Sequence, residues 1–193
     1  MLNAEKQKLR RAMRARRAEM YRQKPEAAIA LRDLFLDAVE VSKGAVVSGY
    51  VACDFEIDPY PIMEVLHHRG HPLCLPVVNG KGESLSFRLY IPGDALVPVG
   101  TPPIPTPAES KTLVWPDLVI APLLAFDVRG NRLGQGAGYY DMTLIELRKR
   151  KKILAVGVGF DCQRADEVPA GMLDAPLDKV VTETQAYTVE KPV

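Results

Sequence analysis

The sequence predicts an α/β fold with a largely parallel sheet, and three observations support it. Short apolar runs alternate with amphipathic helical segments, which is the element order of βαβ units. A glycine-rich stretch at 130–138 lies between an apolar run and a helical segment, as ligand-binding loops do in such folds. The chain has 193 residues, 47% hydrophobic and 25% charged, and shows no repeat or linker. We therefore expect a single domain over residues 1–193.

The elements of the first half follow from apolar spacing and from turn residues. Residues 3–23 predict a helix with a weak apolar stripe among many arginines, and Pro25 suits the first turn of a second helix. Asp58 is expected to cap a third helix, and Gly70 to end it. Strands are predicted at 45–51, 72–78 and 85–90, with the last two joined as a hairpin by the turn at 79–82.

The second half combines one proline-rich segment with the remaining strands. Residues 92–116 hold many of the 16 prolines, which indicates an ordered but irregular crossing segment. The apolar run at 117–126 predicts a buried strand, and the glycine-rich stretch and a helical segment at 142–147 follow it. Further strands are predicted at 153–160, 179–182 and 186–189.

Composition and charge exclude several classes of protein. The net charge is only +1, and no aromatic residues are interleaved with the basic residues of the first helix, which argues against nucleic-acid binding. No apolar run approaches the ~20 residues of a membrane helix, and no apolar segment of a secretory signal is present. The three cysteines are isolated, as reduced thiols are in cytosolic proteins. We expect a cytoplasmic protein that binds neither nucleic acid nor a membrane.

The glycine-rich loop is the most informative feature of the sequence. Gly134, Gly136 and Gly138 let backbone N–H groups approach an anion, and the start of the next helix adds partial positive charge. Arg132 adds a fixed cation, and Asp141 is a candidate magnesium ligand. The spacing fits neither the P-loop nor the dinucleotide fingerprint. A plain mobile loop would explain the glycines, but it would not explain an arginine, two tyrosines and an aspartate beside them.

The loop carries a resemblance to a known family. Residues 131–141, Asn-Arg-Leu-Gly-x-Gly-x-Gly-Tyr-Tyr-Asp, resemble the signature of 5-formyltetrahydrofolate cyclo-ligases. Six further pieces match this family in the same order along nearly the whole chain: Lys6-x-x-Leu9-Arg10, Glu56 after a strand, 75–78, Ile104-Pro105-Thr106-Pro107, 122–127, and Val168-Pro169 followed by Asp174 and Asp178. The resemblance implies a three-layer α/β/α fold related to ribose-5-phosphate isomerases and coenzyme A transferases.

The resemblance also implies a reaction. It is the ATP- and Mg²⁺-dependent cyclisation of 5-formyltetrahydrofolate to 5,10-methenyltetrahydrofolate through an imidoyl phosphate, with release of ADP and phosphate. A folate and ATP would be the small-molecule partners, and we expect a monomer. The implied catalytic residues are Arg132, Tyr139 and Asp141, and the magnesium ligands are Asp141 and Asp174. ATP would contact Lys6, Arg10, Arg132, Leu133, Gly134, Gln135, Gly136, Ala137, Gly138, Tyr139 and Tyr140. The folate would contact Val51, Glu56, Gln135, Gly136, Ala137, Gly138 and Tyr139.

Elementary chemistry is compatible with several of these assignments. Lys6 and Arg10 share one helix face at i and i+4, and the other basic side chains of this helix are expected to be solvated. Glu56 follows a strand at the sheet edge where ligands bind, and a carboxylate suits the N–H groups of a pterin. A metal site at His67, His68 and His71 is disfavoured, because adjacent helical residues point about 100° apart; interaction with the helix C-terminus is the favoured role.

Departures from the family and rival functions remain open at this point. Gln135, Ala137 and Met142 stand where relatives often have other residues, and Ala137 would cost about 1 kcal/mol if it needed a positive φ. One rival is an isomerase or coenzyme A transferase-like enzyme that uses Glu56 as its reactive carboxylate. A second is a folate-binding relative without ligase activity. A third is an RNA-binding or assembly protein that uses the basic N-terminal helix.

Overall fold

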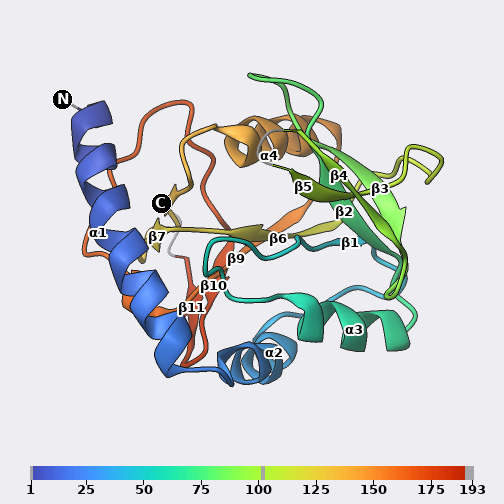
Figure 1. Ribbon diagram of the computed structural model, residues 1–193, viewed down its shortest axis with the longest axis horizontal. Helices are drawn as coiled ribbons and strands as arrows, with labels where there is room; N and C mark the ends of the chain where they lie inside the picture. The colour runs from blue at the N-terminus through green and yellow to red at the C-terminus, as the bar shows by residue number, and fades with distance from the viewer. Residues whose placement is uncertain (1, 101–102, 190–193) are drawn as a thin grey trace.

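A central seven-stranded sheet organises the computed structural model, which describes residues 2–100 and 103–189 (Figure 1). Its strands are β1 (Val47–Ser48), β2 (Leu73–Val77), β3 (Ser86–Tyr90), β6 (Leu118–Pro122), β9 (Leu154–Val158), β10 (Lys179–Val181) and β11 (Ala186–Thr188). Their order is β11-β10-β9-β6-β1-β2-β3. All neighbours from β10 to β2 are parallel, whereas β3 and β11 are antiparallel edges. The predicted α/β class with a largely parallel sheet is confirmed.

Helices cover both faces of the sheet and one of its ends. They are α1 (Leu2–Gln23), α2 (Ala27–Ala38), α3 (Tyr60–His68), α4 (Tyr139–Arg150) and the 3-10 turn η1 (Asp161–Gln163). In Figure 1, α2 and α3 lie on one face, α4 lies on the other, and α1 stands at the end of the sheet. The short strand β7 (Ala125–Phe126) follows β6, and η1 follows β9; α1 contacts both. Thus α1 crosses the carboxyl edge of the parallel strands, where ligands bind in such folds.

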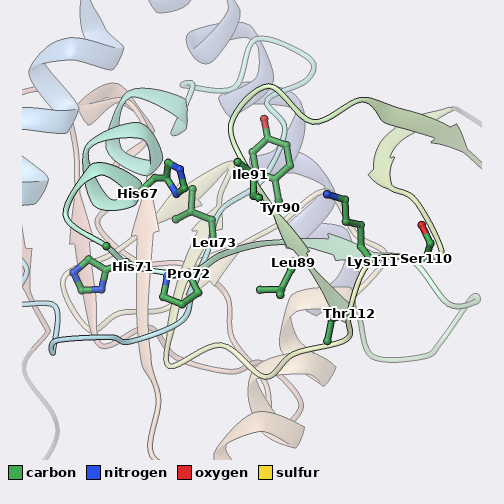
Figure 2. Close-up of a pocket in the computed structure, with 11 residues that line it drawn as sticks. His67, His71, Pro72, Leu73, Leu89, Tyr90, Ile91, Ser110, Lys111 and Thr112 are labelled. Carbon is green, nitrogen blue, oxygen red and sulfur yellow. The ribbon is translucent and has the colours of Figure 1, made fainter.

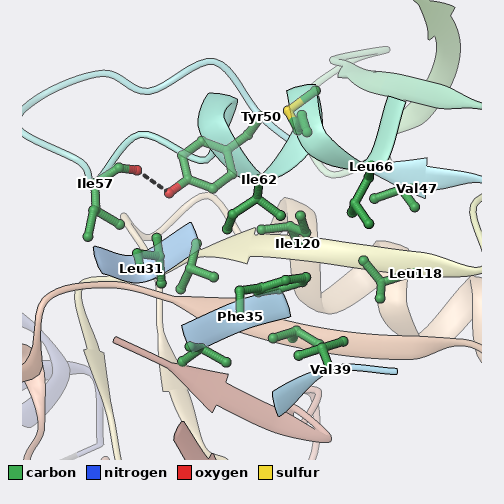
Figure 3. Close-up of a cluster of buried hydrophobic side chains, with 14 of the residues drawn as sticks. Leu31, Phe35, Val39, Val47, Tyr50, Ile57, Ile62, Leu66, Leu118 and Ile120 are labelled. Atoms are coloured by element: carbon green, nitrogen blue, oxygen red, sulfur yellow. Dashed lines mark hydrogen bonds between the residues drawn. The ribbon is translucent and has the colours of Figure 1, made fainter. Parts of the chain in front are cut away.

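Each face of the sheet has its own apolar core. On β6, Leu118 and Ile120 face the cluster under α2 and α3, where Figure 3 shows Phe35 beside them. Val119 and Ala121, which alternate with them, face the cluster under α4. A strand buried on both faces reads as a continuous apolar run rather than as an alternating one. This burial explains why the sequence of β6 was readily recognised as a strand.

Some predicted boundaries differ from the structure. The strand predicted at 117–126 is divided, because β6 ends at Pro122 and β7 pairs instead with β8 (Arg132–Leu133) in a separate ribbon. The segment predicted to be irregular contains a second ribbon of β4 (Leu96–Val99) and β5 (Ile104–Pro107), so that prediction was wrong there. Pro98 and Pro105 lie opposite each other in it. A two-stranded ribbon has free edges, and a proline without an N–H is tolerated at such an edge.

Helix α1 confirms the first predicted helix. Its surface is mostly polar, and only a few apolar side chains pack it against the rest of the molecule. Met13 is buried with Ala125, Leu133 and Val168, and Leu9 packs against them. At the end of the helix, Lys24 Nζ lies 2.8 Å from Glu183 Oε1. No helix in the described part of the chain has the length and apolar character needed to cross a membrane.

Candidate functional site

A buried aspartate builds the turn that leads into the glycine loop. Asp127 is 1% exposed and accepts hydrogen bonds of 3.0 Å from the backbone N–H groups of Arg129, Asn131 and Val168. Three backbone donors fix the carboxylate and, with it, the course of the chain between β7 and β8. The turn therefore delivers Arg132 to the start of the loop in a defined position.

The glycine loop uses backbone conformations that other residues rarely adopt. Gly136 has φ +117°, and Gly138, the N-cap of α4, has φ +74°. A Cβ atom on Gly136 would lie 3.4 Å from Cζ of Arg10, so the glycine also permits close approach of α1. Ala137 is not among the non-glycine residues with positive φ. The strain considered for this alanine does not arise.

The loop arginine and the aspartate at the loop exit form an ion pair. Arg132 Nη2 lies 2.7 Å from Asp141 Oδ1, and the Arg132 side chain is only 2% exposed. The same aspartate oxygen accepts a 3.2 Å hydrogen bond from the backbone N–H of Ala175. Arg132 also lies over the ring of Tyr140, at 5.4 Å from Cζ to the centroid. The contact with Ala175 brings the segment that contains Asp174 beside the loop.

Helix α1 adds two further cations to this cluster. Lys6 Nζ contacts both carboxylate oxygens of Asp174, at 2.7 and 2.6 Å. Arg10 donates from Nε to the carbonyl of Gly134 at 3.0 Å. Burial lowers the pKa of Arg10, as does the charge of Arg14, while nearby carboxylates oppose the shift. The structure thus brings together the five charged residues expected around phosphates and magnesium: Lys6, Arg10, Arg132, Asp141 and Asp174.

Two arginines that were expected to be solvated also belong to this face of α1. Arg14 is exposed but donates from Nη2 to Gln135 Oε1 at 3.0 Å. Arg17 is 2% exposed, donates from Nη2 to the carbonyl of Asp54 at 2.6 Å, and places Nη1 3.6 Å from Glu56 Oε1. The prediction was wrong for Arg17, whereas Arg14 is exposed as expected, although it contacts the loop through Gln135. Spacings of four, four and three residues from Lys6 continue one helix face, so extending the i, i+4 pattern would have identified them.

The candidate pterin anchor, Glu56, is 7% exposed. Its Oε2 accepts from the backbone N–H of Cys53 at 3.2 Å. Burial raises the pKa of Glu56, and the Cys53 N–H, the Arg17 charge and the Gln135 side chain act against that rise. Burial, followed by the charge of Glu56, raises the pKa of the Cys53 thiol to about 12. The carboxylate is therefore held in a confined setting with a buried guanidinium as its counter-charge.

The loop that carries Glu56 is strained and anchored at several points. Asp54 and Phe55 have φ values of +47° and +64°, and they are the non-glycine residues with positive φ in the described ranges. Tyr50 donates from its hydroxyl to the carbonyl of Ile57 at 2.6 Å, which closes the base of the loop (Figure 3). Phe55 packs edge-on against Tyr21 of α1, with ring centroids 5.5 Å apart. Strain of this kind persists where the surroundings enforce it, as they often do at functional sites.

Comparison with known proteins gives this arrangement a family. A model of the family described as "5-formyltetrahydrofolate cyclo-ligase family" matches residues 2–183. The chain belongs to the 5-formyltetrahydrofolate cyclo-ligase family. It is 35% identical to the 5-formyltetrahydrofolate cyclo-ligase of Escherichia coli K12 over 146 residues, which cover 73% of this chain and 79% of the relative. It is 29% identical to the enzyme of the same name from Haemophilus influenzae over 183 residues, or 92% of this chain and 97% of that one.

Solved structures support the same assignment. The NMR structure of Aquifex aeolicus 5,10-methenyltetrahydrofolate synthetase is similar to this cyclo-ligase family member with a TM-score of 0.79 and 28% identity, covering 97% of this chain and 94% of the other. A 5,10-methenyltetrahydrofolate synthetase from Mycoplasma pneumoniae has the same fold, with a TM-score of 0.71 at 19% identity over 92% of this chain and 98% of the other. The chain is accordingly an enzyme of a folate-using ligase family.

The remaining predicted site residues of this cyclo-ligase family member lie around the same edge, with different degrees of burial. Leu133 is 1% exposed and packs in the small core under α1, so only its backbone remains for a ligand. Val51 and Tyr139 are partly buried, and each packs against a different core cluster. The Tyr140 hydroxyl is buried without a hydrogen-bond partner, and burial raises the pKa of this group. Gln135 accepts from Arg14 of α1, and its side chain also acts on the pKa of Glu56.

One hollow in the described part of the chain lies away from these residues. A cavity of about 430 Å³ opens between the end of α3 and strands β2 and β3, and Figure 2 shows His67, His71 and Lys111 at its wall. Lys111 pairs with Asp94 at 2.6 Å, and His71 Nδ1 lies 3.2 Å from the carbonyl of Ala45. No group of three or more His, Cys, Asp or Glu side chains suited to a metal occurs within 2–100 and 103–189. The cavity contains none of the predicted site residues.

Proposed function

We propose that this chain catalyses the ATP- and Mg²⁺-dependent cyclisation of 5-formyltetrahydrofolate to 5,10-methenyltetrahydrofolate, with release of ADP and phosphate. The observation that carries the proposal is the arrangement at the carboxyl edge of the sheet. Lys6, Arg10 and Arg132 lie around the glycine loop together with the carboxylates of Asp141 and Asp174. Further along the same face of α1, Arg17 lies beside Glu56. Such a site can hold phosphates at one end and a hydrogen-bonding heterocycle at the other.

The chemistry needs activation of a poor electrophile. The formyl carbonyl is a formamide, and nitrogen donation makes its carbon unreactive. Transfer of the γ-phosphoryl group of ATP to the formyl oxygen forms an imidoyl phosphate, which has a good leaving group. Attack by N10 closes the ring, and phosphate leaves. Phosphoryl transfer requires mainly positioning and stabilisation of charge, so the absence of an obvious side-chain nucleophile in the predicted site is no obstacle.

Some residues of the site would neutralise the charge of the phosphates, and others would position the folate. Arg132 and Arg10 are positioned to neutralise phosphate oxygens, since one begins the loop and the other contacts its backbone at Gly134. Backbone N–H groups of the loop and the N-terminus of α4 add donors for the same oxygens. Glu56 would hold the pterin, and Tyr139 would position the reacting part of the folate. The proposed roles of Tyr140, Gln135 and Val51 are contacts with these two ligands.

Asp141 and Asp174 fit a magnesium ion by their chemistry and by their proximity. Both are hard oxygen donors, and the Asp141 carboxylate accepts from the N–H of Ala175, the residue after Asp174. Magnesium takes one or two carboxylates and keeps several waters, so this pair suffices. The bound ion would supply charge neutralisation for the phosphates of ATP. In the structure Asp174 pairs with Lys6 and Asp141 pairs with Arg132. Partner exchange would free both cations for phosphate oxygens.

A spectroscopic assay tests the proposal directly. The methenyl product has its own chromophore, so purified protein is mixed with 5-formyltetrahydrofolate in the presence and absence of Mg-ATP. We expect the chromophore only when both magnesium and ATP are present, with one ADP formed per ring closed. Folate binding without a chromophore would favour the non-catalytic relative, and turnover without ATP would favour the isomerase or transferase alternative. In keeping with the proposal, the enzyme would act in the cytoplasm as a monomer on small molecules.

A further inference from the structure

Unpartnered buried donors lie at both ends of the candidate site, and two of them belong to the arginine beside the proposed pterin anchor. Within residues 2–100 and 103–189, four buried side-chain polar atoms have no hydrogen-bond partner: Arg17 Nε, Arg17 Nη1, Arg132 Nε and Tyr140 Oη. Each of them carries a hydrogen that it can donate. A buried donor without an acceptor is rare in native proteins, because its lost hydration is not replaced. The two on Arg17, beside Glu56, indicate that a ligand with an acceptor completes this part of the site.

Arg17 is the best defined of these donors. Its Nη2 is fixed by the carbonyl of Asp54 at 2.6 Å, and the side chain is buried. Its Nη1 lies 3.6 Å from Glu56 Oε1, beyond a normal hydrogen bond, so the guanidinium lies next to the carboxylate without being saturated by it. A role limited to supporting the strained loop would use Nη2 alone. That role leaves Nη1 and Nε unexplained.

The chemistry of a pterin matches this pair of groups. The amide edge of the pterin ring presents an amino group and a ring N–H, both donors, next to the ring carbonyl, an acceptor. If Glu56 accepts from the two donors, the group beside the carboxylate must donate to the carbonyl. Arg17 Nη1 occupies that neighbouring position.

We propose that Arg17 is a specificity-determining residue that donates a hydrogen bond to the ring carbonyl of the pterin while Glu56 accepts from its N–H groups. The inference rests on the proposed function and on Glu56 as the pterin anchor. It extends substrate recognition to a basic side chain of α1, the helix that also supplies Lys6 and Arg10 to the phosphate end. One helix would then select both substrates.

The test compares two ligands that differ only at this oxygen. Binding of 5-formyltetrahydrofolate and of its 4-thioxo counterpart is measured by calorimetry without ATP. The thioxo compound keeps both donors but presents a sulfur, which is a weak acceptor. We expect the wild-type protein to prefer the oxo compound by roughly tenfold or more, as for a hydrogen bond to a charged group. Arg17→Met should weaken oxo binding by a similar factor and leave thioxo binding nearly unchanged. Arg16→Met, at an exposed neighbour, is the matched control and should alter neither.

The outcomes are decisive even if Arg17→Met fails to fold. Equal affinity of the wild-type protein for the two compounds would overturn the inference without any variant. In a folded variant, equal weakening of both ligands would assign Arg17 to loop support and would also overturn it. If the wild-type protein bound 5-formyltetrahydrofolate with no preference while still closing the ring with ATP, only the role of Arg17 would fail. If the wild-type protein bound no folate at all, the proposed function would fail as well.

Discussion

The two ends of the candidate site differ in how their charges are satisfied. At the glycine loop, Lys6 is paired with Asp174, Arg132 with Asp141, and Arg10 with a backbone carbonyl. Around Glu56, in contrast, the buried donors of Arg17 and Tyr140 have no partner. The proposed phosphate end is therefore largely closed on itself, with Arg132 Nε as its unpartnered buried donor in the described ranges, whereas the proposed pterin end has hydrogen bonds still to make. We infer that ATP and magnesium bind by replacing the existing ion-pair partners of Lys6, Arg132 and the two aspartates. A folate would bind instead by supplying acceptors to buried donors that have none.

The substitution with the largest expected effect removes the carboxylate of Asp141 at the exit of the glycine loop. Asp141→Asn keeps an acceptor for Arg132 and Ala175 but removes the charge that would attract magnesium. We expect kcat to fall on the order of 100-fold or more, because a metal ion at transferring phosphates contributes several kcal/mol. The chromophore assay measures kcat across a magnesium titration. Asp33→Asn, which changes an exposed ion pair, is the control. Near-normal turnover at low magnesium would refute the metal assignment.

At the open end, Glu56→Gln should act on one substrate only. The amide keeps the shape of the carboxylate but turns one acceptor into a donor, which faces the N–H groups of the pterin. An unpaired buried donor costs about 1–3 kcal/mol, so the folate KM should rise roughly five- to 150-fold. The KM for ATP should hardly change. The reverse pattern, with ATP affected and folate unaffected, would show that Glu56 does not anchor the pterin.

Partner exchange at the closed end predicts opposite effects of a single substitution. Lys6→Gln removes a cation that neutralises Asp174, so magnesium should bind to the variant more tightly in the absence of nucleotide. The same change removes a phosphate contact worth about 1.5–3 kcal/mol, so ATP should bind roughly tenfold more weakly. Calorimetry with each ligand alone measures both effects. Arg11→Gln, at an exposed position of the same helix, serves as the control. Weakening of both ligands would argue that Lys6 only supports the fold.

The smallest expected effect is on the pH dependence of folate binding. Burial raises the pKa of Glu56, so this carboxyl takes up a proton at a higher pH than the usual value near 4.5. Protonated Glu56 can no longer accept two N–H groups, so folate affinity should fall as the pH decreases through this raised value and level off above it. Arg17 and Gln135 oppose the shift, and Gln135→Leu should therefore move the midpoint to higher pH. Folate affinity is measured without ATP across a range of pH. The Glu56→Gln variant should not show the fall in affinity at low pH that protonation of Glu56 causes.

The sequence predicts much of the frame and part of the site, for reasons that can be traced to particular residues. The parallel strands were predictable because β6 and β9 are buried on both faces and read as unbroken apolar runs. The β4–β5 ribbon was missed because its prolines dominate the local signal, although Pro98 and Pro105 lie at free edges. Lys6 and Arg10 were identified through the family motif. Arg17 was missed because the helix face of Lys6 and Arg10 was not extended along α1, and its contacts with Asp54 and Glu56 are long-range.

The crossing of α1 over the carboxyl edge has a consequence for the folding of the enzyme. Lys6 and Asp174 are separated by 168 residues, yet few apolar side chains hold α1 to the rest of the molecule. A helix attached in this way can detach in a sub-global opening while the seven-stranded core remains folded. Its amides should then exchange with deuterium sooner than those of β6 and β9. In rising urea, catalysis should disappear before the circular dichroism of the core changes, so loss of activity would report detachment of one helix rather than denaturation.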